Sequence, residues 1–118
     1  MATATNQDVA MCDAALSRVF DILGKRWNGL IVGMLSNGPV GFSGLSRAVN
    51  GISDSVLSDR LATLTKAGLV TRTVDPGPPV AVSYELTESG RALQPALQEL
   101  VTWAHQHPLA TASCKGDD

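Results

Sequence analysis

Residues 41–70, GFSGLSRAVNGISDSVLSDRLATLTKAGLV, hold the pattern that decides the fold. Apolar residues recur there every three or four positions, as they do on the buried face of an amphipathic helix. They form one stripe of Phe42, Leu45, Ala48 and Val49 and a second stripe of Val56, Leu57, Leu61 and Leu64. The turn signal Asn50-Gly51 separates the two stripes. We therefore expect two short helices, over residues 41–49 and 53–67, joined by a tight turn.

A two-stranded hairpin is expected after the second of these helices. That helix has Ser53 as a good N-cap, Ile52 before it as a hydrophobic staple, and Gly68 at its end. After Gly68 the apolar period changes from 3.6 to 2, which predicts strands over residues 69–74 and 80–86. The proline-rich loop between them can continue neither a helix nor a ladder of strands.

Further helices are expected on both sides of this unit. Leu16, Val19, Phe20 and Leu23 are spaced as one helical face, and they predict a helix over about residues 13–24. The same spacing returns over residues 27–35. Near the other end, Thr87 can cap a last helix in which Pro95 introduces a kink. The tail from Pro108 is small and polar, and we expect it to be mobile.

The composition is that of one folded domain. With 118 residues, 44% hydrophobic and 17% charged, the chain is too apolar and too weakly charged for a disordered protein. We expect a single, mostly helical α+β domain over residues 1–118, with an ordered core over about residues 10–107 and flexible termini. No apolar run approaches the roughly 20 residues of a membrane span, and the N-terminus lacks a secretion signal. A cytoplasmic location is therefore expected.

The charge distribution bears on the partner. The net charge of −2 argues against a nucleic-acid-binding protein, since affinity for DNA depends on Lys and Arg meeting phosphates. Residues 18–72, however, contain seven basic residues against three acids, a net charge of +4. One face of the fold can therefore be basic although the whole chain is acidic.

Two short helices followed by a hairpin are typical of a winged helix-turn-helix, whose second helix can enter a major groove. Hydroxyl side chains on that helix can bond phosphates or base edges, and Arg60 can donate two bonds to a guanine. Asp54 is tolerable there as a cap of the helix N-terminus, and Asp59 if it pairs with a nearby base or accepts from a cytosine. The candidate DNA-binding residues are Arg47, Ser53, Ser55, Ser58, Asp59, Arg60, Lys66 and Arg72.

The order of these blocks resembles the HxlR-type transcription regulators, winged-helix relatives of the MarR regulators. The resemblance covers about residues 12–107. It is carried by Cys12, Leu16 to Trp27, Gly41 to Leu45, Gly51 to Ser53, Val56 to Leu61, Ala67 to Val70 and Val82 to Gly90. This chain departs from the family pattern in having Asp54 and Ser55 where members are more basic, and in having no basic residue in the wing loop 75–79.

The resemblance implies a homodimer on double-stranded operator DNA. Its N- and C-terminal helices would interlock and place two recognition helices in successive major grooves, with half-sites about 10 bp apart. The interface candidates are Leu16, Leu97, Leu100 and Trp103. An alternative, which the acidic composition favours, is a winged-helix module for protein contact whose DNA binding is weak or lost.

Cys12 matches the position of the redox- or electrophile-sensing cysteine of the family, just ahead of the first expected helix. The helix dipole there would lower the pKa of the thiol, and a bulky adduct would disturb the helix and the dimer. The other interpretation is a small buried residue next to Met11. Cys114 is the only second cysteine, and a bridge between Cys12 and Cys114 of two subunits is an open alternative.

No set of residues predicts catalysis, a cofactor or a metal. The serines have no His/Asp arrangement to activate them, and no glycine-rich phosphate loop occurs. His105 and His107 lie on different faces of the last helix, without a third ligand. Trp27 and Trp103 suit either a core or interface position or the lining of a small-molecule effector pocket. We therefore expect a regulator rather than an enzyme.

Overall fold

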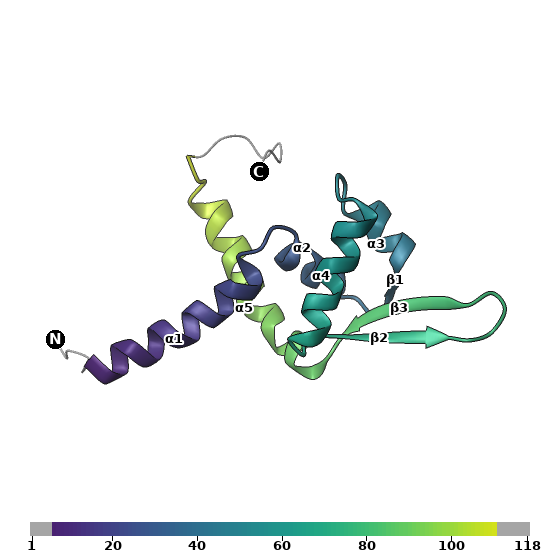
Figure 1. Cartoon of the computed structure of the whole chain (residues 1–118). Coiled ribbons are helices and arrows are strands. Elements are labelled where there is room, and N and C mark those ends of the chain that lie inside the picture. Colours follow the sequence, from purple (N-terminus) through teal and green to yellow (C-terminus); the bar gives the residue numbers. More distant parts are fainter. Residues whose placement is uncertain (1–5, 111–118) are drawn as a thin grey trace.

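The structure is a computed structural model that describes residues 6–110, with side chains from residue 13 onward. It is mostly helical, with a small antiparallel sheet beside the helices (Figure 1). This confirms the winged helix-turn-helix fold of the mostly helical α+β class. In chain order the elements are α1 (Asn6–Leu23), α2 (Asn28–Met34), β1 (Val40–Gly41), α3 (Phe42–Ala48), α4 (Asp54–Lys66), β2 (Val70–Asp75), β3 (Ala81–Leu86) and α5 (Glu88–Gln106).

The sheet has three strands, in the order β1-β3-β2, whereas the sequence predicted only the β2–β3 hairpin. β1 was missed because it is two residues long and pairs with a strand more than forty positions away. Val40 lies opposite Tyr84, and Gly41 lies opposite Ser83. The hairpin itself was predicted correctly, with Val70 opposite Leu86 and Asp75 opposite Ala81.

The hydrophobic core lies between α2, α3, α4 and the sheet. The leucine stripe of α4 enters it completely, because Leu57, Leu61 and Leu64 are at most 1% exposed. The other buried apolar residues are Ile31, Val32, Leu35, Leu45, Val49, Val70, Tyr84 and Leu86. None of them comes from the described part of α1 or from α5. The core therefore belongs to the helix-turn-helix and its wing.

Two side chains cap helices as the sequence predicted. The Ser53 hydroxyl accepts from the backbone N–H of Val56 at the start of α4. Thr87 accepts from the N–H of Gly90 at 3.1 Å and donates to the Gly68 carbonyl at 2.6 Å. A side chain at Gly90 would overlap the carbonyl oxygen of Leu69, so glycine lets α5 begin in close contact with the sheet.

α1 differs from its prediction in its start. The helix begins at Asn6 rather than near residue 13, and it projects away from the core (Figure 1). Its projection contributes to the elongated shape of the chain, 63 × 33 × 23 Å. α5 continues past Pro95 to Gln106. The predicted mobile tail lies outside the described residues from position 111 onward.

Candidate nucleic-acid interface

The exposed side of α4 follows from the burial of its leucines. Because these anchor one face of the helix in the core, the opposite face is turned to solvent. Ser53, Ser55, Ser58, Asp59 and Lys66 are all exposed. The predicted hydroxyl-bearing face therefore exists, and its side chains are accessible to a ligand.

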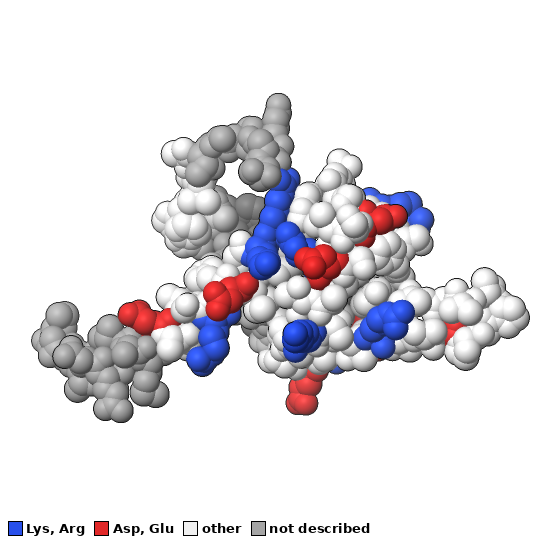
Figure 2. Space-filling model, viewed as in Figure 1, with Lys and Arg blue, Asp and Glu red and all other residues white. Residues whose placement is uncertain are grey.

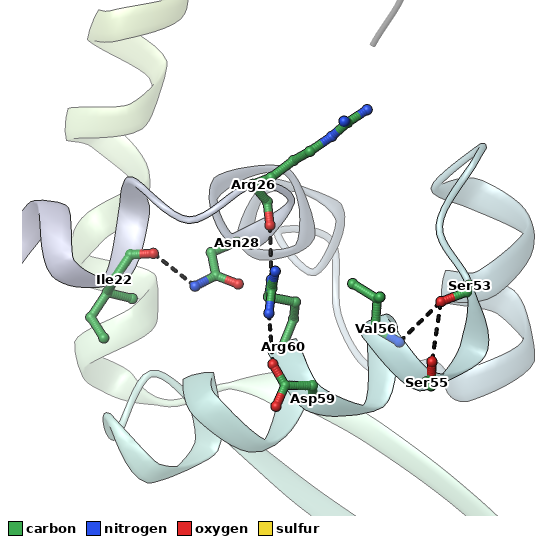
Figure 3. A network of polar contacts seen from close by, with 8 residues as sticks. All are labelled: Ile22, Arg26, Asn28, Ser53, Ser55, Val56, Asp59 and Arg60. Atoms are coloured by element: carbon green, nitrogen blue, oxygen red, sulfur yellow. Dashed lines mark hydrogen bonds and ion pairs between the residues drawn. The ribbon is translucent and has the colours of Figure 1, made fainter. Parts of the chain in front are cut away.

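A side-chain hydrogen bond joins the first turn of α4 to α3. Ser46 of α3 donates to the Asp54 carboxylate at 3.0 Å. The hydroxyls of Ser53 and Ser55 lie 3.3 Å apart (Figure 3). The carboxylate of Asp54 also lies in the first turn, where the helix dipole favours negative charge. These contacts give the acidic start of α4 a structural role within the helix-turn-helix.

A crevice of about 370 Å³ separates the C-terminal half of α4 from the wing. We call it the α4–wing crevice; it is lined by Ser58, Ala62, Thr65, Lys66, Arg72 and Tyr84. Arg72 and Tyr84 are cross-strand neighbours on β2 and β3. Within residues 6–110, neither Lys66 nor Arg72 has an ion pair or hydrogen bond from its side chain, so both charges are available to an anion.

Thr65 and Tyr84 were not among the predicted site residues. Thr65 donates to the Leu61 carbonyl at 2.7 Å, an ordinary bond within a helix, and Tyr84 is 8% exposed. The sequence contained one usable signal, which was the hairpin register that places Tyr84 opposite Arg72. Their place in the crevice depends otherwise on how α4 packs against the sheet.

Arg60, for which the sequence suggested two bonds to a guanine, has two hydrogen-bond partners within the protein. Its Nε donates to the backbone carbonyl of Arg26 at 3.0 Å, and its Nη1 to the Asp59 carboxylate at 2.6 Å (Figure 3). Only 21% of the Arg60 side chain is exposed, against 65% for Asp59. The side chain is turned toward the loop before α2, which contacts α4 there. The pair also offsets the negative charge of Asp59 on the outer face.

Basic side chains on the viewed face are scattered over several elements and interrupted by acidic ones (Figure 2). Arg47 is exposed in the last turn of α3, and its side chain has no partner within the described part of the chain. Arg47, Lys66 and Arg72 therefore supply three separate cationic positions from α3, α4 and β2. This distribution allows contact with a phosphate backbone despite the net charge of −2.

A second exposed surface is apolar and is formed by α1, α2 and α5. Three of the four predicted interface residues are exposed: Leu16 by 56%, Leu100 by 55% and Trp103 by 49%. Leu97, the fourth, is half-buried and packs against the core. Leu30 of α2 and Val101 of α5 line a groove of about 520 Å³ between these two helices, the α2–α5 groove.

The structure changes the placement of Cys12. Because α1 begins at Asn6, Cys12 is about two turns inside the helix rather than ahead of it. The effect of the helix dipole fades within the first turn, so the argument for a lowered thiol pKa from the helix N-terminus no longer applies. The side chain of Cys12 and the whole of Cys114 lie outside the described residues.

The remaining candidates give no chemical site. Within residues 6–110, no group of His, Cys, Asp and Glu is arranged to hold a metal ion. The His107 ring lies 5.9 Å from that of Trp103, and the Trp27 ring lies under the Arg26 guanidinium. None of the helices within residues 6–110 is long and apolar enough to cross a bilayer.

Comparison with known proteins identifies the family to which the chain belongs. A family model described as HxlR-like helix-turn-helix matches residues 22–111. The HTH-type transcriptional regulator YodB of Bacillus subtilis (strain 168) is 44% identical over 91 residues, which cover 77% of this chain and 81% of YodB. The fold and the exposed recognition helix define a winged helix-turn-helix transcription regulator. The chain belongs to the HxlR-like family of these regulators, and it is not an enzyme.

Solved relatives have the same fold. The reduced form of YodB superposes with a TM-score of 0.74 at 41% identity, covering 83% of this chain and 96% of YodB. Quinone-bound YodB gives 0.70 at 40% identity, covering 78% and 96%. The redox regulator HypR in its oxidised form gives 0.73 at 28% identity, covering 78% and 95%. Two relatives are therefore known in ligand-bound or oxidised states.

Proposed function

We propose that the protein binds operator DNA as a homodimer and places α4 of each protomer in a major groove. The α4–wing crevice carries this proposal. Lys66 and Arg72 lie there without partners in the described chain, beside the exposed hydroxyl of Ser58. Cations from a helix and a wing strand in one crevice suit a backbone phosphate, while the serine can bond a phosphate or a base edge.

The predicted DNA-binding residues other than Arg60 each have a place in this arrangement. Ser55 and Ser58 project from the exposed face of α4 toward base edges, and Arg47 meets a phosphate beside α3. Ser53 acts mainly as the helix cap, since its hydroxyl is already bonded to Val56. Asp59 is held by Arg60 and limits which bases α4 accepts, because a carboxylate accepts from a cytosine and repels phosphates.

The dimer is supported by the apolar surface of α1, α2 and α5. A second copy of the chain is the occupant that fits it, because α1 carries Leu16, Val19 and Phe20 exposed on one face, well away from the core. The α2–α5 groove, which Leu30, Leu100 and Val101 line, adds further apolar surface. Self-complementary apolar patches are the usual basis of a two-fold dimer. Interlocking α1 and α5 across such a dimer also sets the distance between the two α4 helices.

The DNA-binding part is tested by fluorescence anisotropy with the reduced protein. The probes are a labelled duplex from upstream of its own gene and a scrambled duplex of the same length, at one near-physiological salt concentration. We expect tight binding to the upstream duplex alone, falling steeply as salt rises. Equal and weak binding to both duplexes would contradict autoregulation, and a genome-wide selection of bound fragments would then distinguish another operator from a protein-contact module.

The effector is proposed from the relatives. YodB is known in a quinone-bound form and HypR in an oxidised form, so we propose that an electrophile or oxidant acts on Cys12 of this chain. With a quinone, the thiolate sulfur forms a bond to a ring carbon. The hydrogen of that carbon moves to one ring oxygen and the other oxygen takes a proton from water, so that the quinone is reduced to a hydroquinone thioether. An adduct within α1 would alter the dimer surface on that helix. Intact mass after benzoquinone treatment should rise by one adduct and the operator complex should dissociate.

A matched pair of cysteine variants assigns the reacting thiol. Cys12→Ser should remain bound to the operator in the presence of benzoquinone, whereas Cys114→Ser should dissociate like the wild type. Dissociation of both variants to the same extent would exclude Cys12 as the sole site of action. A covalent dimer in oxidised wild-type protein, absent from both variants, would instead support the bridge between Cys12 and Cys114.

A further inference from the structure

The loop between α1 and α2, residues 24–27, contacts the helix-turn-helix at two places. The backbone carbonyl of Arg26 accepts from Nε of Arg60, in the middle of α4 (Figure 3). The Trp27 ring lies against the turn between α3 and α4, where a Cβ added to Gly51 would sit 3.7 Å from it. One short loop therefore contacts both the turn and the recognition helix.

The conformation of this loop is unusual and well specified. Trp27 has a φ of 84°, a left-handed conformation that bulky residues rarely adopt. Such strained residues persist only where their surroundings hold them. Arg26 covers the Trp27 ring at 4.4 Å, and the fully buried Asn28 donates to the carbonyl of Ile22 at 2.7 Å. The end of α1, the loop and the start of α2 are thus bonded to one another.

We propose that Arg60 is a positioning residue, which fixes α4 to the α1–α2 loop so that the orientation of the recognition helix follows the end of α1. The inference rests on the proposed role of α4 in DNA binding. A guanidinium suits this role because its planar fork can hold two acceptors at once. Here these are the Arg26 carbonyl and the Asp59 carboxylate, on two different elements. A displacement of α1 would reach α4 through the bond between the Arg26 carbonyl and Nε of Arg60, while the bond to Asp59 holds the guanidinium in place on α4.

The placement of Arg60 separates this role from direct contact with DNA. Its side chain is 21% exposed, whereas Ser55, Ser58 and Lys66 of the same helix are exposed residues. Lys66 and Arg72 have no partners within the described residues, whereas Arg60 already uses Nε and Nη1 inside the protein. Charge-assisted bonds of this kind are stronger than neutral ones. Two of the five N–H groups of Arg60 are therefore already used within the protein.

Arg60→Lys in a Trp103→Phe background tests the proposal without DNA. The chain has two tryptophans, so this background leaves Trp27 as the only fluorophore of its kind. Lysine keeps the charge but cannot hold both acceptors in the same geometry. We expect acrylamide to quench Trp27 more strongly, because the loop is released from α4. Arg91→Lys is the matched control, since Arg91 pairs with Glu85 at 3.2 Å on other elements and its replacement should leave Trp27 unchanged.

A second readout is the binding of the variant to the operator duplex. Arg60→Lys should weaken binding to the operator roughly tenfold, about 1.4 kcal/mol. The loss of affinity should be similar for duplexes with a changed base pair at any position, and the slope of log affinity against log salt should stay unchanged. Unchanged Trp27 quenching, with discrimination lost at a single base pair, would overturn the proposal in favour of a base contact. An unchanged variant in both measurements would overturn it as well.

Circular dichroism checks that each variant is folded before these measurements. If Arg60→Lys does not fold, Asp59→Asn decides the matter, because it removes the charge that holds Nη1 and leaves the Arg26 carbonyl in place. It should increase Trp27 quenching in the same direction but less, and an unchanged value would overturn the proposal. Quenching is measured on free protein, so it tests Arg60 even if the wild type binds no duplex specifically.

Discussion

The helix-turn-helix and its wing differ from the surface formed by α1 and α5 in how their apolar residues are covered. In the first region the leucines of α4 are at most 1% exposed, and α2, α3 and the sheet surround them. In the second region Leu16, Phe20 and Leu100 are each more than half exposed. A single chain therefore completes the packing of the DNA-binding unit but not that of its outer helices.

This contrast assigns different kinds of work to the two regions. The covered region folds within one chain, so its geometry is fixed before any partner arrives. In the proposed dimer, the open region gains its packing from a second chain, so its geometry depends on that partner. A regulator that responds to a signal needs a region of each kind. The DNA-binding surface has to be rigid, and its position relative to the DNA has to be able to change. Four substitutions test this contrast.

Leu61→Ala should have the largest effect, because it removes a side chain that is 1% exposed in the middle of the core. Truncation of a buried leucine costs about 2–5 kcal/mol in free energy of unfolding. Urea denaturation followed by circular dichroism measures this loss. Leu109→Ala is the control, since Leu109 is 62% exposed and its truncation should change stability by less than about 0.5 kcal/mol. Equal effects would contradict the contrast in packing.

Phe20→Glu should separate the subunits without unfolding the helix-turn-helix and its wing. The ring of Phe20 is 54% exposed in one chain, and a carboxylate buried there without a partner would oppose dimer formation. We expect the dimer dissociation constant to rise about a hundredfold, which is about 2.7 kcal/mol. Sedimentation equilibrium measures it. Arg18→Glu, on the opposite side of α1, is the control and should leave the dimer dissociation constant at its wild-type value. If both substitutions raise this constant equally, the dimer interface lies elsewhere.

Thr87→Ala should destabilise the junction between the sheet and α5. The substitution removes both the cap on Gly90 and the bond to the Gly68 carbonyl, and loss of a threonine cap costs about 1 kcal/mol. Urea denaturation measures this loss as well. Thr87→Ser keeps the hydroxyl and should recover most of the stability. If serine is no better than alanine, the methyl group rather than the hydroxyl matters at this position.

Lys66→Ala should change DNA binding and leave stability nearly unaltered, because Lys66 is exposed and has no ion pair within the described part of the chain. Removing one phosphate contact should lower the slope of log affinity against log salt by about 1, with similar losses on all sequences. Lys25→Ala is the matched control, since Lys25 lies in the α1–α2 loop outside the α4–wing crevice. An unchanged slope for Lys66→Ala would remove the crevice from the DNA interface.

The sequence predicted α4 well because the signals for it are local. The leucine spacing gives its buried face, Ser53 gives its start and Gly68 its end, and each acts within a few residues. The hairpin was predicted for the same reason. β1 was missed because its two residues form a strand only through pairing with β3, a contact that depends on the whole fold.

The sequence predicted which residues of α4 are exposed but not the direction of every side chain. Exposure of Ser55, Ser58 and Lys66 follows from helical periodicity alone. The direction of Arg60 does not, because its partner is the carbonyl of Arg26, 34 positions earlier in the chain. The start of α1 was also missed, although Val9 and Cys12 continue the spacing of Leu16 and Val19 toward the N-terminus. That error had placed Cys12 ahead of the helix.

The anchoring of α4 by Leu57, Leu61 and Leu64 has a consequence for how such regulators diverge. The leucines fix the helix from one side, so exchanges at Ser55 and Ser58 on the other side leave the fold intact, typically within about 0.5 kcal/mol. After a gene duplication, the two copies can therefore acquire different DNA preferences through single surface exchanges. Within this thirteen-residue helix, one set of residues maintains the fold and a different set determines the DNA sequence that is bound.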